Sequence, residues 1–116
     1  MGPRPTESFP PSERLRKRSE FLRVQGRGRK LVSRSFLLFL LDGTARTRLG
    51  VTVSKKVGGA VVRNRLKRWV REIYRRNKAL FPRGKDVVLV AKREAAGLEF
   101  ADFREEMRQA LRRAGP

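Results

Sequence analysis

Residues 54–72 have the sequence SKKVGGAVVRNRLKRWVRE, in which a turn with two glycines runs directly into an amphipathic segment. At about 100° per residue, five apolar side chains of this segment fall in one stripe. They are Val62, Leu66, Trp69, Val70 and Ile73. The spacing predicts a helix with one face buried against a core, while basic residues cover the other side.

The basic side of this predicted helix places like charges at neighbouring positions, and Glu72 is its one acid. Each like-charge pair costs about 0.2–0.5 kcal/mol in an isolated helix, and solvated helix faces usually mix the two signs. A bound polyanion relieves this repulsion. The pattern therefore favours contact with nucleic acid over an ordinary solvated face.

The composition indicates the same class of partner. The chain has 116 residues, with 30 Lys and Arg against 11 Asp and Glu, so its formal net charge is +19. This charge repels itself and is offset when phosphates bind. The length and the 39% hydrophobic content fit one small domain. Because the sequence has no run of about 18 apolar residues and no apolar signal segment, we expect a cytoplasmic protein with no membrane partner.

Several kinds of catalytic site are excluded by the residue types present. The chain has no Cys and no His, so it has no thiolate nucleophile, no Cys-ligated zinc and no imidazole base. Asp42, Asp86 and Asp102 are scattered, and the adjacent Glu105 and Glu106 fall on a predicted amphipathic helix. We therefore expect no catalytic site and no metal site on the protein.

The start of the chain is predicted to be a flexible extension, residues 1–13, because it contains Pro3, Pro5, Pro10 and Pro11. The domain is then expected to cover residues 14–113. Ser19 is a plausible N-cap for a short helix that ends near Gly26 or Gly28.

Three strands and a last helix are predicted after it. Residues 36–41 and 48–54, with Asp42-Gly43 as a turn signal between them, are predicted to form an antiparallel hairpin. Residues 86–91 form a continuous apolar run, which is typical of a strand covered on both faces. Phe100, Phe103, Met107, Ala110 and Leu111 have helical spacing, so they are predicted to be core. The fold class is α+β, a single-domain α/β sandwich with helices packed on a small, mostly antiparallel sheet.

Residues 54–58 (SKKVG), 60–62 (AVV) and 63–68 (RNRLKR) together resemble the signature of the bacterial ribonuclease P protein subunit. The resemblance extends over about residues 14–111. It implies the element order αββ(β)αβα, with a further short strand and a left-handed βαβ crossover, against the usual right-handed preference.

The resemblance also implies a function: binding of the catalytic ribonuclease P RNA and of the 5′ leader of precursor tRNA, to assist endonucleolytic removal of the leader. In this family the RNA carries the catalytic Mg²⁺, so no protein-bound cofactor and no obligate protein partner are expected.

The contacts to the catalytic RNA are expected around the glycine turn and the basic helix that follows it. Guanidinium groups suit phosphate contacts, and Asn64 either bonds RNA or caps its own helix. Gly58 and Gly59 either bring backbone N–H groups near a phosphate or only shape the turn. The expected contacts to the catalytic RNA are Lys55, Lys56, Arg63, Asn64, Arg65, Lys67, Arg68 and Arg71.

A second surface, a cleft between the first helix and the sheet, is expected from the same resemblance to hold the single-stranded leader. Aromatic stacking suits leaders of varied sequence, because it tolerates any base. Stacking and core packing are equally open for Phe39, whereas core packing is slightly favoured for Phe21. Gln25 stands where family members often carry an aromatic residue, which predicts weaker stacking. The expected contacts are Arg14, Arg16, Lys17, Phe21, Gln25, Phe39, Arg48, Thr52 and Ser54.

The charge and the mixed fold also suit other functions. A small basic ribosomal protein would bind ribosomal RNA with no preference for a leader. A protein-only nuclease would cleave RNA by itself, with no partner RNA. A DNA-packing protein would bind without any preference for the shape of an RNA.

Overall fold

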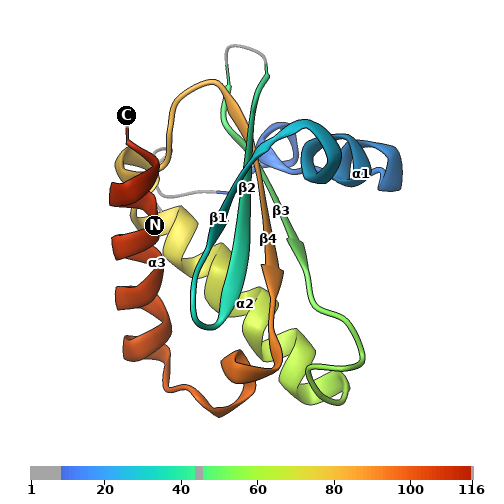
Figure 1. The fold of residues 1–116 in the computed structure, drawn as a ribbon, viewed down its shortest axis with the longest axis vertical. Helices are drawn as coiled ribbons and strands as arrows, with labels where there is room; N and C mark the ends of the chain where they lie inside the picture. The colour runs from blue at the N-terminus through green and yellow to red at the C-terminus, as the bar shows by residue number, and fades with distance from the viewer. Residues whose placement is uncertain (1–8, 44–45, 116) are drawn as a thin grey trace, which may run out of the picture.

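A computed structural model describes residues 9–43 and 46–115 of the chain (Figure 1). The main elements are α1 (Arg18–Arg27), β1 (Arg29–Val32), β2 (Phe36–Asp42), β3 (Arg48–Thr52), α2 (Ala60–Arg76), β4 (Lys85–Ala91) and α3 (Phe100–Ala114). Short 3₁₀ turns lie at Pro11–Glu13, Lys78–Leu80 and Arg93–Gly97. The α+β class and the order αββ(β)αβα are confirmed, and β1 is the further short strand.

The sheet has the order β1-β2-β4-β3, in which β4 pairs antiparallel with β2 and parallel with β3. The predicted hairpin between residues 36–41 and 48–54 is therefore wrong, because β4 lies between these two strands. Val87, Val88 and Leu89 of β4 are buried, so both faces of this strand are covered. A strand that is covered on both faces is most stable in the centre of a sheet. β3, which has a partly polar face, lies at the edge.

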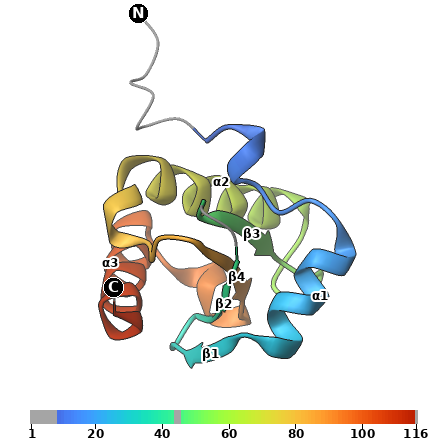
Figure 2. The same cartoon turned by 90° about the horizontal axis from the view of Figure 1, so that it is seen from above.

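The two parallel neighbours, β3 and β4, are joined by α2, so α2 is the helix of a βαβ crossover. The left-handed sense of this crossover stays a prediction. Figure 2 shows α1 on one side of the sheet and α3 on the other.

The sheet has a hydrophobic core on each face, as the alternation of side chains along its strands requires. Leu38 and Leu89 belong to the larger core, which α2 and α3 cover, whereas Phe39 and Val88 belong to a smaller core under α1. The apolar stripe of α2 and the core positions of α3 are confirmed. Their buried members are Leu66, Val70, Ile73, Phe103, Met107, Ala110 and Leu111.

The first helix begins one residue before the predicted cap. Lys17 occupies the N-cap position and Ser19 lies inside α1, so the prediction that Ser19 caps the helix is wrong. The carboxylate of Glu20 takes the place of a side-chain cap, since it accepts hydrogen bonds from the backbone N–H groups of Lys17 (3.1 Å) and Arg16 (3.3 Å). The helix ends at Arg27, directly before Gly28, in agreement with the predicted end.

Part of the predicted extension packs on the domain. The ring of Phe9 lies 5.1 Å from that of Tyr74. Glu13 accepts a hydrogen bond from the Tyr74 hydroxyl (2.5 Å) and pairs with Lys78 (2.9 Å). Phe9 and Glu13, which lie upstream of the expected boundary at Arg14, are therefore packed on the domain, while residues 1–8 lie outside the described residues.

Candidate nucleic-acid interface

The structure brings the predicted contacts to the catalytic RNA together in one region, the turn after β3 and the first three turns of α2. Lys55 and Lys56 are exposed in the turn, and Asn64, Arg68 and Arg71 are exposed on the helix. Arg63, Arg65 and Lys67 are half-buried beside the apolar stripe. We call these eight residues the helix surface.

Not every arginine of the helix surface is equally available to a ligand. Arg65 donates from Nη2 to the carbonyl oxygen of Ala96 (3.0 Å), and its guanidinium lies 5.3 Å from the centre of the Trp69 ring. This side chain therefore fastens α2 to the 3₁₀ turn at Arg93–Gly97. Arg68 and Arg71 lie on the outer side of the helix and are exposed.

The N-terminus of α2 bears on the predictions for Asn64, Gly58 and Gly59. Gly59 is the N-cap, and Asn64 lies in the second turn, so the interpretation of Asn64 as a cap is wrong. A Cβ at Gly58 would lie 3.0 Å from the side chain of Val62, which explains this glycine by packing. A Cβ at Gly59 would meet nothing within 4 Å, so the helix N-terminus is open to an approaching group at this point.

The residues predicted to bind the leader include members of α1 and β3, two elements that meet at Phe21 and Gly50. A Cβ at Gly50 of β3 would lie 2.5 Å from Cε1 of Phe21, so the absence of a side chain there allows the Phe21 ring to lie directly on the strand. Phe21 is half-buried, whereas Phe39 is only 8% exposed and packs in the core with Val24 and Val88. The geometry favours core packing for Phe39, and it places Phe21 against the same core with more of the residue exposed.

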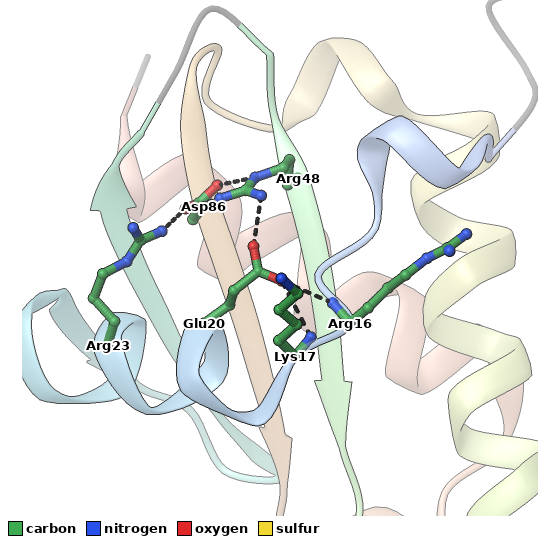
Figure 3. Close-up of polar contacts among 6 residues, drawn as sticks. All are labelled: Arg16, Lys17, Glu20, Arg23, Arg48 and Asp86. Carbon is green, nitrogen blue, oxygen red and sulfur yellow. Dashed lines mark hydrogen bonds and ion pairs between the residues drawn. The ribbon is translucent and has the colours of Figure 1, made fainter.

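A buried carboxylate connects α1 to the sheet (Figure 3). Asp86 of β4 is 0% exposed and accepts hydrogen bonds from Nη2 of Arg23 (2.6 Å) and from Nε and Nη2 of Arg48 (both 2.8 Å). Arg48 also donates from Nη1 to Glu20 (2.7 Å). Since Glu20 holds the backbone of Arg16 and Lys17, the contacts run without a break from β4 through β3 to the start of α1.

This network favours the charged forms of Arg48 and Glu20. The hydrogen bond to Asp86 raises the pKa of Arg48, and the backbone hydrogen bond from Lys17 is the largest cause that lowers the pKa of Glu20. Arg48, a predicted leader contact, is therefore engaged with two carboxylates inside the protein.

Sequence reasoning missed Glu20, Arg23 and Asp86, and it had grouped Asp86 with the scattered acids. One signal was present: Asp86 opens the apolar run of β4 in a chain with few acids. Charged residues are almost never fully buried unless they are paired. An acid that opens a buried strand therefore indicates that a basic partner lies beside it.

Apart from Arg14, the other predicted leader contacts fall into two groups. Arg16 and Lys17 are exposed at the start of α1, and Ser54 is exposed just after β3. Gln25 and Thr52 are half-buried, and Thr52 shares the strand face of Gly50, next to the Phe21 ring. Arg14 turns away from this group, because its Nη2 donates to the carbonyl oxygen of Phe9 (2.7 Å) and its guanidinium lies 4.6 Å from the centre of the Phe9 ring.

Within residues 9–43 and 46–115, no three Asp or Glu side chains are grouped so that they could hold a metal ion. In the same part of the chain, no helix is long and apolar enough to cross a membrane.

Comparisons with known proteins agree with this geometry. The model of the Ribonuclease P family matches residues 9–115. The Ribonuclease P protein component of Thermotoga maritima is 42% identical over 113 residues, which cover 93% of this chain and 97% of the relative. The protein of the same name from Geobacter sp. (strain M21) is 46% identical over 110 residues and 93% of each chain.

Solved structures show the same similarity. The RNase P protein of T. maritima superimposes with a TM-score of 0.80 at 38% identity, over 87% of this chain and 96% of the other. That of Staphylococcus aureus gives a TM-score of 0.83 at 28% identity, over 89% and 95%. The chain, with its basic α2 and its mixed four-stranded sheet, belongs to the ribonuclease P protein family.

Proposed function

We propose that the chain acts as the protein component of the ribonucleoprotein endoribonuclease ribonuclease P, and that two surfaces bind two RNAs. The helix surface binds ribonuclease P RNA. The leader surface, defined as Arg16, Lys17, Phe21, Gln25, Thr52 and Ser54, binds the 5′ leader of precursor tRNA. The proposal places the complex in the cytoplasm, where precursor tRNA is made in bacteria.

The observation that carries the proposal is the unpaired charge of the helix surface. None of the ion pairs found in the described part of the chain involves Lys55, Lys56 or Arg68. The one acid of α2 is engaged with other cations, since Glu72 pairs with Arg75 and Arg76 at the other end of the helix. Lys55, Lys56 and Arg68 are therefore left for a polyanion.

The helix surface suits contact with the RNA backbone more than reading of bases. A guanidinium presents its N–H groups as a planar fork that meets two phosphate oxygens together. Such contacts set orientation and contribute affinity without sequence information. At the open end of α2, the backbone N–H groups beside Gly59 add a favourable field for a phosphate.

The leader surface combines one aromatic ring with cations. Stacking of a base on the exposed part of Phe21 is worth roughly 1–3 kcal/mol and tolerates any base. Arg16 and Lys17 attract the leader backbone, and their side chains are exposed while their backbone N–H groups are held by Glu20. This combination suits leaders of varied sequence.

The chemistry of cleavage is assigned to the RNA. The described residues offer no carboxylate cluster that fits Mg²⁺, so we assign the Mg²⁺ of the complex to the RNA and no step to a protein-bound metal. The residues of this chain bind and orient the two RNAs.

A small ribosomal protein is the alternative function. It would explain the charge, but the match to the Ribonuclease P family over residues 9–115 supports the first proposal.

A cleavage assay tests the proposed function. Precursor tRNA is incubated at low Mg²⁺ with ribonuclease P RNA alone, with the chain alone and with both. Cleavage that requires both is the expected result. Failure of the chain to rescue cleavage would favour the ribosomal alternative, and cleavage by the chain alone would contradict the assignment of chemistry to the RNA.

A pair of matched variants tests the two surfaces. Arg68→Ala with Arg71→Ala and Arg16→Ala with Lys17→Ala each remove two exposed cations. The first pair is expected to weaken binding of ribonuclease P RNA. The second is expected to reduce the preference of the assembled complex for precursor tRNA over leaderless tRNA. Equal effects of both pairs on both measurements would contradict the division into two surfaces.

A further inference from the structure

A large basic hollow lies at the other end of α2 from the start of the helix surface. It has a volume of about 940 Å³ and opens between the N-terminal segment, the end of α2 and residues 78–83. Its apolar wall includes Tyr74 and Phe81, whose rings are buried and lie 4.9 Å apart. The basic side chains that line it are Arg46, Arg75, Arg76, Lys78, Arg83 and Arg108.

A second hollow of about 390 Å³, between α2 and α3, continues the first. The two share Arg76, Asn77 and Arg108, so they form one groove, which we call the basic groove. Seven basic side chains, including Arg104, line it against two acids, Glu13 and Glu72. The excess of positive charge lies in a concave site, where a field is focused more strongly than on a convex surface.

Three of the seven cations of the basic groove are oriented by carboxylates of the protein before any ligand binds. Glu72 pairs with both Arg75 (2.7 Å) and Arg76 (2.6 Å), and Glu13 pairs with Lys78 (2.9 Å). Arg83 is exposed at the mouth. The Nε of Arg108 is buried and has no hydrogen-bond partner in the described part of the chain. Pre-oriented donors of this kind lose less side-chain entropy when they bind an anion.

We propose that the basic groove binds backbone phosphates of ribonuclease P RNA, at a site separate from the helix surface. This inference rests on the proposed function. The exposed Arg68 and Arg71 continue the basic face along α2 towards Arg75, and α2 is about 24 Å long at about 1.5 Å per residue. One RNA that follows this face passes from the helix surface into the groove.

The position of the groove favours this RNA over the precursor leader. The leader surface depends on α1, which lies on one face of the sheet, whereas the second hollow lies between α2 and α3, which cover the opposite face (Figure 2). A single-stranded leader held at Phe21 would have to pass around the sheet to reach Arg108. The groove therefore extends the footprint of the RNA that binds α2.

The first experiment measures the salt dependence of affinity for ribonuclease P RNA alone, without precursor tRNA. Arg46→Ala with Arg83→Ala removes two cations from the groove, and Arg34→Ala with Arg112→Ala removes two exposed arginines that do not line it. The groove pair is expected to reduce the slope of log K against log salt by about 1–2, because each lost phosphate contact contributes about 0.9. The control pair is expected to leave the slope unchanged.

Equal slopes for the groove pair and the control pair would overturn the inference. The proposed function is judged separately, by the Arg68→Ala, Arg71→Ala pair. If the slope falls for this pair and stays unchanged for the groove pair, the helix surface is still supported as an RNA-binding site. The basic groove is then rejected as one.

The second experiment locates the RNA at the groove. The chain has no Cys, so Arg83→Cys and Lys56→Cys each create one attachment point for a tethered hydroxyl-radical source. Cleavage of ribonuclease P RNA from both positions, at different nucleotides, is the expected result. Cleavage from residue 56 alone would overturn the inference, and so would cleavage of precursor tRNA instead of ribonuclease P RNA from residue 83.

Discussion

Asp86 shows how one residue ties the leader surface to the sheet. Removing a carboxylate from water is costly, and a buried ion pair often contributes no more stability than apolar residues of the same volume. Here the cost is offset by hydrogen bonds from two guanidiniums. These hydrogen bonds fix the position of α1 relative to the sheet, because Arg23 reaches Asp86 from α1 and Arg48 reaches it from β3. We infer that Asp86 is a positioning residue for the start of α1.

Asp86→Asn is expected to destabilise the fold by about 3 kcal/mol, because Arg23 and Arg48 lose the buried carboxylate between them and Arg48 keeps only Glu20. Urea unfolding measures this loss. The variant is also expected to lose preference for leader-bearing tRNA while it still binds ribonuclease P RNA. Asp42→Asn is the matched control, since it removes the same charge from an acid that is 89% exposed and pairs with Lys85. Equal unfolding curves for the two variants would contradict the role of Asp86.

Individual residues also mark where sequence reasoning stops. The acids could be counted, but which guanidinium meets which carboxylate depends on β3 lying beside β4, a contact between distant parts of the chain. The surroundings of Phe39 also depend on contacts between distant parts of the chain. Its apolar strand position is compatible with packing under α1 and with contact to a base. Its burial with Val24 and Val88 is set by the packing of α1.

At the scale of elements, helices were predicted well and strand partners were not. The apolar spacing of α2 and α3 is a local property, so it could be read directly from the sequence. The pairing of β2 depends on a strand more than forty residues away, as the register Leu38↔Leu89 shows. A turn signal at Asp42-Gly43 suggested a hairpin, but the two-sided apolar character of β4 outweighs it.

The docking of α1 on β3 can be tested with two glycines. Gly50→Ala is expected to destabilise the fold by about 1–3 kcal/mol, because the new methyl group overlaps the Phe21 ring and displaces α1. Gly26→Ala lies within α1, where a Cβ would meet nothing within 4 Å. It is expected to stabilise the protein by about 0.5–1 kcal/mol through helix propensity.

Thermal unfolding of both glycine variants measures these changes. A loss of leader preference in Gly50→Ala, with ribonuclease P RNA binding kept, is expected if α1 forms one wall of the leader surface. Wild-type stability in Gly50→Ala would show that α1 moves away from β3 at no cost.

At the scale of the whole molecule, the set of titrating groups predicts a broad plateau of stability. Hydrogen bonds lower the pKa of Glu20 and Glu72 below 4.5, chiefly those from the Lys17 backbone and from Arg75. Burial raises the pKa of Glu13, but bonds from Lys78 and Tyr74 outweigh it, so the net shift is also downward. These contributions are complete above about pH 4.5 and are lost as the pH falls through the lowered values.

The alkaline limit of the plateau has the opposite sign. Burial, and then Glu13, raise the pKa of Tyr74 above 10.0, so its contribution is complete below pH 10 and is lost as the pH rises further. With no His and no Cys, no side chain of ordinary pKa titrates between these limits. We expect melting temperatures that stay flat from about pH 5.5 to 9 and a smaller acid-side loss for Glu13→Gln. A step near neutral pH would contradict this assignment.

The net charge of +19 predicts a steep dependence of RNA affinity on salt. With many phosphates contacted, the slope of log K against log salt is expected to be steeper than about −3. Titration of ribonuclease P RNA at several KCl concentrations measures it. A shallower slope would mean that few phosphates are touched and would count against both the helix surface and the basic groove.

The central position of β4 also has a consequence for the newly made chain on the ribosome. Until residues 85–91 have emerged, β2 and β3 both lack β4, the strand that lies between them in the sheet. Both hydrophobic cores also lack the side chains that β4 contributes. Contacts between distant segments make such folding slow, and unpaired strand edges promote aggregation in the meantime. The nascent chain is therefore expected to stay unfolded until residue 91 has left the ribosome. A stalled chain that ends near residue 80 should be readily digested by protease, whereas a released chain that includes residues 1–116 should resist.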